Sequence, residues 1–273
     1  MKNILIISGL LLCCISGYPQ EQQGKVTYDF IANGEKKTMV LFFDDSSSLC
    51  VYNKEGWDTN YAAFRGALFD SSSGFGIKVN QYDSTGALIY RNFRSEKLVV
   101  RQTKVGILNA FIVRDNWVTI SWELLDEEEI IAGYTCRKAI GNFRGRQYTA
   151  WYAPDLKNPY GPWKLFGLPG LILEAHDKEK VFRMTATAIS WTDTTTISEP
   201  FEPEIKTLEE YVYYLDHSGR LVHEKLRSKP LPKGIKIGDI QHETPKEEVR
   251  NKSLEKVFEW EDSEVRSMMI NKN

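Results

Sequence analysis

The sequence predicts a mainly β protein with C-terminal helices, built on a curved antiparallel sheet of the half-barrel or barrel-like kind. About ten short strand-like segments follow one another at close spacing, with no helix between them. Parallel strands need long crossover connections, so segments joined by short turns are expected to pair antiparallel. Helix signals are confined to the part after residue 195. A single sheet of this width is expected to curl.

The expected strands are alternating or short apolar runs bounded by turn residues. The run 26–30 alternates apolar and polar residues, as a half-buried strand does. Hairpin signals stand at Asp83-Ser84-Thr85-Gly86 and at residues 141–145, whereas residues 53–74 favour a loop. Strands are expected at 26–30, 37–43, 49–52, 75–79, 87–90, 98–101, 111–113, 117–122, 132–140, 146–152, 171–175 and 181–191.

Four consecutive acids, Asp126 to Glu129, follow Trp122. Paired carboxylates can perform acid–base chemistry or bind calcium. Neighbouring side chains on a strand point to opposite faces, so these four cannot all converge on one ion. A solvated turn is therefore the favoured interpretation.

The part from residue 196 to 273 is expected to form helices and loops packed on the sheet. Thr207-Leu208-Glu209-Glu210 matches a capping box, in which a threonine hydroxyl and a glutamate satisfy free amides at a helix start. Thr244-Pro245-Lys246-Glu247 repeats this start signal, with proline at the first helical position. Residues 229–243 between them carry proline and glycine and predict a loop.

Residues 1–17 predict a secretory signal peptide, followed by a β domain at 18–195. Lys2 precedes a mostly apolar run at 4–15, and small residues follow. The run is too short for a membrane anchor, because a spanning helix needs roughly 20 apolar residues. Lipidation at Cys13 is the less favoured alternative, since Leu12 precedes it. With no other segment able to span a membrane, a soluble mature protein is expected after export.

The net charge of −2 gives no basic surface for nucleic acid. The sequence also indicates no cofactor and no metal site. Its four histidines, His176, His217, His223 and His242, lack the spacing of a helical zinc motif, and no Cys-x-x-Cys pair is present.

Two cysteines remain after the expected signal peptide, Cys50 and Cys136. An exported protein meets an oxidising compartment, which permits a disulfide between them. Two separate buried thiols are the alternative. The sequence does not decide between the two.

The most distinctive segment runs from Gly161-Pro162 through Gly167-Leu168-Pro169-Gly170 to Glu174. Leu168-Pro169-Gly170-Leu171 fits a type II turn, because proline fixes φ at the second position and glycine supplies a positive φ at the third. Gly167 allows a bend just before it. These residues form a structural motif that leads into a buried strand at 171–173.

Aromatic residues around this segment form the candidate ligand-binding cluster. Its members are Trp151, Tyr152, Tyr160, Trp163 and Phe166. In a cleft, such rings could bind an apolar or sugar ligand; packing in the core is the alternative, and ring exposure distinguishes the two.

The chain resembles the GLPGLI family of exported Bacteroidota proteins. The resemblance rests on five elements in this order: Trp122-Glu123, residues 131–139 (IAGYTCRKA), residues 143–146 (FRGR), Ala150-Trp151-Tyr152, and residues 161–174 (GPWKLFGLPGLILE). It covers residues 117–190 closely. The resemblance implies export to the periplasm or the outer-membrane side, and it brings no catalytic residues. A looser fold similarity is to periplasmic lipoprotein-sorting half-barrels.

Together these features favour a non-enzymatic cell-envelope protein that binds an apolar small molecule or an envelope protein. One alternative is an envelope hydrolase, with carboxylates or a His–Ser pair brought together from distant segments. Another is a structural or assembly component whose exposed sheet edges pair with a partner.

Overall fold

The computed structural model describes residues 23–57, 83–104, 109–192, 195–228 and 244–261. The expected signal peptide, the strand at 75–79 and the loop at 229–243 lie outside these residues.

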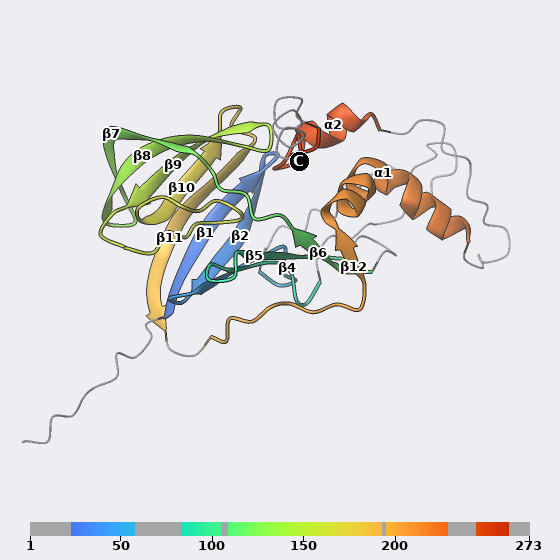
Figure 1. Cartoon of the computed structure of the whole chain (residues 1–273), viewed down its shortest axis with the longest axis horizontal. Coiled ribbons are helices and arrows are strands. Elements are labelled where there is room, and N and C mark those ends of the chain that lie inside the picture. The colour runs from blue at the N-terminus through green and yellow to red at the C-terminus, as the bar shows by residue number, and fades with distance from the viewer. Residues whose placement is uncertain (1–22, 58–82, 105–108, 193–194, 229–243, 262–273) are drawn as a thin grey trace, which may run out of the picture.

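Twelve strands form one open, curved sheet, which confirms the predicted mainly β class (Figure 1). Its order is β12-β6-β5-β4-β3-β2-β1-β11-β10-β9-β8-β7, and only β12 runs parallel to its neighbour. The strands are β1 Gln23–Ala32, β2 Glu35–Phe43, β3 Ser47–Tyr52, β4 Ala87–Asn92, β5 Lys97–Gln102, β6 Phe111–Asp115, β7 Trp122–Ile131, β8 Tyr134–Phe143, β9 Arg146–Ala153, β10 Leu171–Asp177, β11 Phe182–Thr192 and β12 Ile205–Thr207.

The core lies on one face of the sheet, which we call the inner face. Strand β1 shows why, because Val26, Tyr28 and Phe30 are buried while the residues between them are more exposed. Its partners β2 and β11 place Leu41 and Met184 in the same layer. The period of two thus sends one set of apolar side chains of these three strands to the inner face.

Strand β7 contradicts the predicted turn at Asp126–Glu129, because these four acids lie within a ten-residue strand. The strand stands at the edge of the sheet, where its acidic side chains reach water. A bulge between Leu124 and Glu128 adds residues opposite β8. The expected strand at 117–122 is correspondingly a loop up to Trp122, where β7 begins. Because the side chains of this edge strand are exposed, its sequence lacks the alternation of apolar and polar residues from which strands were predicted.

The connection from β11 to β12 covers the outer face of β5 and β6. Figure 1 shows it running along the side of these strands opposite α1. Glu199 accepts a hydrogen bond from Lys97 at 2.5 Å, and Glu202 accepts one from Arg101 at 2.7 Å. Val99 beneath is 1% exposed. This connection therefore covers the outer face of β5 and β6, whereas outer-face side chains such as Arg183 on β11 stay exposed.

Two helices lie on the inner side of the sheet, α1 Leu208–Arg227 and α2 Lys246–Asn251 (Figure 1). The predicted capping box at Thr207 is confirmed, with Glu210 as its partner. At α2 the prediction is wrong in detail, because Pro245 itself is the cap residue and no side chain caps the helix. Within the described residues, no helix has the length and apolar character needed to cross a membrane.

Candidate functional site

Four of the five predicted ligand-binding rings are core residues. Tyr152, Tyr160, Trp163 and Phe166 are 2–7% exposed. The Tyr160 ring lies 4.5 Å from that of Phe93, and the Trp163 ring lies 5.6 Å from that of Phe143, measured between centroids. These rings fill the concave inner side, and no cleft separates them. Trp151 differs: it is half-buried on the outer face of the sheet.

The loop at 154–170 carries three of these rings onto the inner face and is held there by Arg91. This guanidinium is fully buried. It donates to the carbonyl oxygens of Gly161 at 2.8 Å and Leu165 at 3.0 Å, and to the Ser48 hydroxyl at 3.1 Å. The pKa of Arg91 falls to about 10, because burial disfavours its charged form. Main-chain dipoles thus replace the carboxylate that normally accompanies a buried arginine.

Two glycines of the loop motif lie so close to neighbouring main-chain atoms that a side chain would not fit. The predicted type II turn is wrong, because φ of Gly170 is +159° where such a turn needs about +80°, and Leu171 donates its N–H to the carbonyl oxygen of Leu156. A Cβ on Gly170 would lie 2.3 Å from the carbonyl oxygen of Ala153, and one on Gly161 would lie 2.7 Å from that of Leu165. Among the three glycines of this motif, only Gly167 is required for its backbone angle alone, since its φ is +91° and the space around it is open. Pro162, Leu168 and Pro169 complete this structural motif.

An ion cluster fixes the same loop to the β8–β9 turn and to the C-terminal segment. Lys164 donates to Asp115 at 2.5 Å and to Glu255 at 2.8 Å. Arg144 donates to Asp115 at 2.7 Å, to Glu259 at 2.7 Å and also to Glu255. Burial raises the pKa of Asp115, but Lys164 and Arg144 hold it below its ordinary value.

The residues 251–261, here called the strap, lie along the β8–β9 turn. Arg146 donates to the carbonyl oxygens of Ser253 at 2.8 Å and Asn251 at 2.7 Å, and Tyr148 donates to that of Leu254 at 2.8 Å. A Cβ on Gly145 would lie 2.8 Å from the Val257 side chain, and the Lys256 N–H donates to the carbonyl oxygen of Arg144 at 2.8 Å, so the two main chains are in contact. The strap closes one side of the inner face.

Both cysteines are free, buried thiols in this structure, so the disulfide that the sequence permitted is not formed. Cys50 lies on β3 and Cys136 on β8, with β2, β1, β11, β10 and β9 between them. Burial raises the pKa of each thiol to about 11, which keeps both protonated and unreactive at neutral pH.

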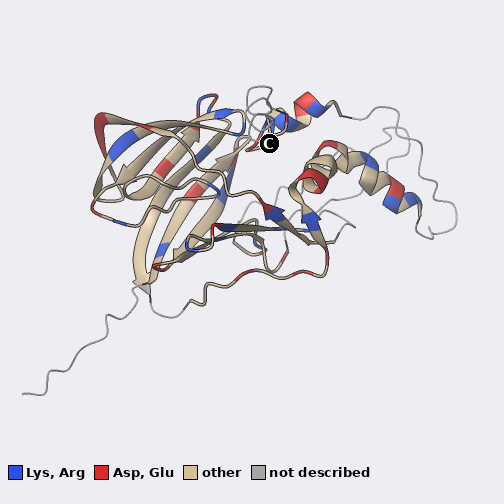
Figure 2. Cartoon of the chain, in the orientation of Figure 1, with Lys and Arg blue, Asp and Glu red and all other residues tan. Residues whose placement is uncertain are grey.

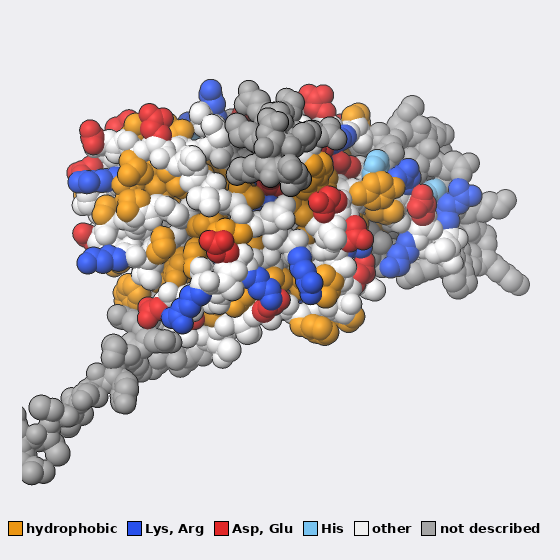
Figure 3. All heavy atoms as spheres, viewed as in Figure 1, with side chains coloured by type: hydrophobic (Ala, Val, Ile, Leu, Met, Phe, Trp, Pro, Cys, Tyr) orange, Lys and Arg blue, Asp and Glu red, His pale blue; other side chains and the backbone are white. Residues whose placement is uncertain are grey.

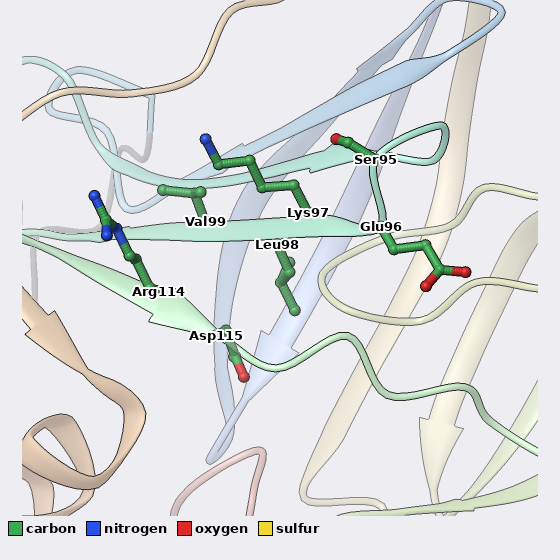
Figure 4. A pocket seen from close by; sticks show the side chains of 7 residues that line it. All are labelled: Ser95, Glu96, Lys97, Leu98, Val99, Arg114 and Asp115. Atoms are coloured by element: carbon green, nitrogen blue, oxygen red, sulfur yellow. The ribbon is translucent and has the colours of Figure 1, made fainter.

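Neither of two surface hollows offers a converging set of reactive groups. One, of about 210 Å³, is lined by Ser95, Glu96, Lys97, Leu98, Val99, Arg114 and Asp115. Figure 4 shows Leu98 and Asp115 pointing to one side of the sheet, while Val99 and Arg114 point to the other. The second, of about 490 Å³, is lined by Asn33, Val181, Pro245, Glu247, Glu248, Asn251 and Lys252. There Glu248 and Lys252 already form an ion pair at 2.7 Å. Within the described residues, no group of three or more histidines, cysteines or acids could hold a metal ion.

The candidate site is instead a row on the outer face, which crosses β8, β9, β10 and β11. Trp151 stands between Lys138 and Glu174 in the strand register, and Thr185 follows. Glu174 accepts hydrogen bonds from Arg183 and Thr185, each at 3.0 Å. Burial raises the pKa of Glu174, but its hydrogen bonds with His176, Arg183 and Thr185 hold it below the ordinary value. We call Lys138, Trp151, Glu174, Arg183 and Thr185 the outer-face row.

Charges balance along this row. Lys138 donates to Glu127 at 2.6 Å, and its ammonium lies 5.9 Å from the centre of the Trp151 ring. Arg183 is 54% exposed, and Ile31 beside it on β1 is 37% exposed. A flat surface with one aromatic ring, aliphatic area and paired charges suits recognition of another molecule more than chemistry on it.

Sequence reasoning found Trp151 but missed its neighbours and the buried charges. Glu174 and Lys138 lay within motif elements, but the face that each side chain takes depends on strand register and on a bulge in β10, which the sequence does not show. Lys164 stands in an apolar segment, a signal for a buried partner. Nothing local in the sequence marks Arg91, because its partners are main-chain carbonyls far along the chain.

No family model matches the sequence, and no curated protein is significantly similar to it. Among solved structures, PNGF-II in space groups P21 and C2 is similar, with 16% identity and TM-scores of 0.48 and 0.47. Each similarity covers 70% of this chain and 32% of PNGF-II, so the chain spans about a third of PNGF-II's length. Values this low carry no argument about function.

Arg91→Leu is expected to destabilise the protein by about 3–5 kcal/mol, because two buried carbonyl oxygens lose their donor. Urea denaturation followed by tryptophan fluorescence measures it. Arg94→Leu, at an exposed position nearby, is the matched control. A loss below about 1 kcal/mol for Arg91→Leu would contradict the assigned role.

Gly170→Ala is expected to cost about 2 kcal/mol or more, because the added methyl group meets the Ala153 carbonyl and the main chain must shift. Gly34→Ala is the control with a positive φ but open space around it. Equal losses of melting temperature in the two variants would show that backbone angle and not contact matters at Gly170.

Asp115→Asn is expected to lower stability by about 3 kcal/mol at pH 7. The folded pKa of Asp115 lies below its unfolded value, so its contribution is complete above about pH 4 and is lost as pH falls through the folded value. The difference from wild type should therefore shrink at about pH 2–3 in urea titrations. Asp126→Asn, at an exposed acid of β7, is the control, and an unchanged difference at both pH values would refute the assignment.

Proposed function

We propose that this chain is an exported protein of the bacterial cell envelope, related to the GLPGLI family, that works by binding a partner macromolecule and not by catalysis. The apolar run after Lys2 and the order of motif elements from Trp122 to Glu174 support the family and the export. Periplasm or outer-membrane side is the corresponding location.

The observation that carries the proposal is the division of the motif residues between the two faces. Tyr152, Tyr160, Trp163 and Phe166 fill the inner side, where a small ligand would otherwise bind. Trp151, Lys138 and Glu174 belong to the same motif elements and point outward. The first group builds the fold. In the second, Trp151 and Lys138 are partly exposed and can be reached by another molecule, while the buried Glu174 lies beside them and holds the exposed Arg183.

Binding on a surface also suits the chemistry of the titratable groups. Asp115, Glu255, Arg144 and Lys164 neutralise one another inside the protein, so they are structural groups. The outer-face row presents an aromatic ring and an exposed arginine, the side chains that contribute most at interfaces.

A photo-crosslinking amino acid at Thr149 tests the proposal in cells. Thr149 lies on the outer face between Ile140 and His176 and two residues from Trp151. We expect a discrete adduct from the envelope fraction after irradiation, and we expect Trp151→Ala to reduce it. The same amino acid at Tyr213, 53% exposed on α1, is the control. No adduct at Thr149, or equal adducts at both positions, would contradict the proposal.

A further inference from the structure

The strand β7 leaves one side of its main chain without a partner in the described part of the protein. It ends the strand order and pairs only with β8. Figure 1 places it at the end of the sheet farthest from α1. A free edge of this kind can accept an added strand from another molecule.

The register shows which groups are free. Ala132 and Gly133 form a two-residue turn with positive φ at both positions, and Ile131 pairs with Tyr134 across it. The pair that closes such a turn exchanges both of its hydrogen bonds, and hydrogen-bonding residues then alternate. Ile131 and Glu129 thus bond to β8, whereas Glu128 and Ile130 direct their N–H and C=O groups outward.

Charge selects what this edge can accept. β7 holds five acids and no base, and the whole β7–β8 hairpin adds only Arg137 and Lys138 (Figure 2). Glu128 and Glu127 pair with these two bases. Glu123, Asp126 and Glu129 form no ion pair with any residue that the structure describes.

The edge also presents apolar area between its charges. Ile130 is 76% exposed, the largest exposed fraction of any isoleucine or leucine described, and Leu124 is 52% exposed. Figure 3 shows acidic and basic side chains along the rim at this end, with hydrophobic ones between them. An added strand would cover Ile130 while its main chain bonds Glu128 and Ile130.

The same acids disfavour a second copy of this chain as occupant. Antiparallel pairing of two β7 strands about Glu129 would place Glu129 opposite Glu129, and like charges directly opposite are destabilising. The bulge between Leu124 and Glu128 limits regular pairing to Glu128–Ile131. Pairing of this edge with a second copy of β7 is thus disfavoured, and pairing with a basic strand is favoured.

We propose that the Glu128–Ile131 edge of β7 binds an extended basic segment of a partner protein by strand addition. Lysine or arginine of the segment faces Glu129, and apolar side chains cover Ile130. This inference rests on the proposed function, because it names the chemistry and the binding mode of the partner.

Amide hydrogen exchange by NMR tests the proposal with a peptide of alternating lysine and valine. The peptide is expected to slow exchange at Glu128 and Ile130, while Glu129 and Ile131 change little because β8 already protects them. Two control peptides carry glutamate in place of lysine, or proline in place of every second valine, and neither should slow exchange. Binding without slowed exchange at Glu128 and Ile130, or no binding, would overturn the proposal.

The variant Glu129→Lys should bind the lysine peptide at least about fivefold more weakly, because the peptide lysine that faces residue 129 then meets a like charge. Glu55→Lys makes the same change of charge at an exposed position after β3, which six strands separate from β7 in the strand order, and should bind like wild type. Equal weakening in both would indicate net charge alone and overturn strand addition. A crosslinked adduct at Thr149 without peptide binding would overturn strand addition and leave the proposed function in place. Peptide binding without an adduct at Thr149 would overturn the proposed function and leave strand addition in place.

Discussion

A single buried guanidinium determines how the inner side of this sheet is closed. Arg91 donates to the carbonyl oxygens of Gly161 and Leu165, and its Cζ atom lies 5.6 Å from the centre of the Phe166 ring. Burying a charge without a counter-ion is costly unless fixed dipoles solvate it. The loop at 154–170 provides those dipoles, so Arg91 and the loop each require the other's position. Trp163 and Tyr160 reach the core only because this loop is held down.

The ion cluster extends the same arrangement to the C-terminus. Lys164 comes from the loop, Arg144 from the β8–β9 turn, Asp115 from β6 and Glu255 from the strap. Four segments distant in sequence thus meet in one buried network. Such a network adds little net stability compared with apolar packing, but loss of one member leaves an unpaired buried charge. It specifies where the strap lies, and it leaves the outer face as the accessible part of the motif.

Local chemistry accounts for what the sequence could predict. Alternation at Val26–Phe30 and the capping box at Thr207 act through neighbours along the chain, so both were predictable. The strand β7 was not predicted, because an edge strand can carry charged side chains that face solvent and its acids therefore do not show the apolar pattern of a strand. Glycine is required at position 170 because of a close contact with Ala153, and only the folded chain brings these two residues together. Of the candidate rings, Trp151 alone lies at the surface. Which face of the sheet a side chain takes depends on strand register, and a bulge in β10 between Ile172 and Glu174 shifts that register.

The central claim is that the loop at 154–170 is a permanent part of the core and not a lid over a binding cavity. Native-state hydrogen exchange measures this directly at the amides of Gly167 and Ile172, which donate to the carbonyl oxygens of Pro159 and Tyr160 at 2.9 Å each. These amides are expected to exchange only through global unfolding, with the same free energy of opening as the central strands β1 and β11. Fast exchange at Gly167 and Ile172 while β1 and β11 stay protected would contradict it, because the loop would then open over the inner face on its own.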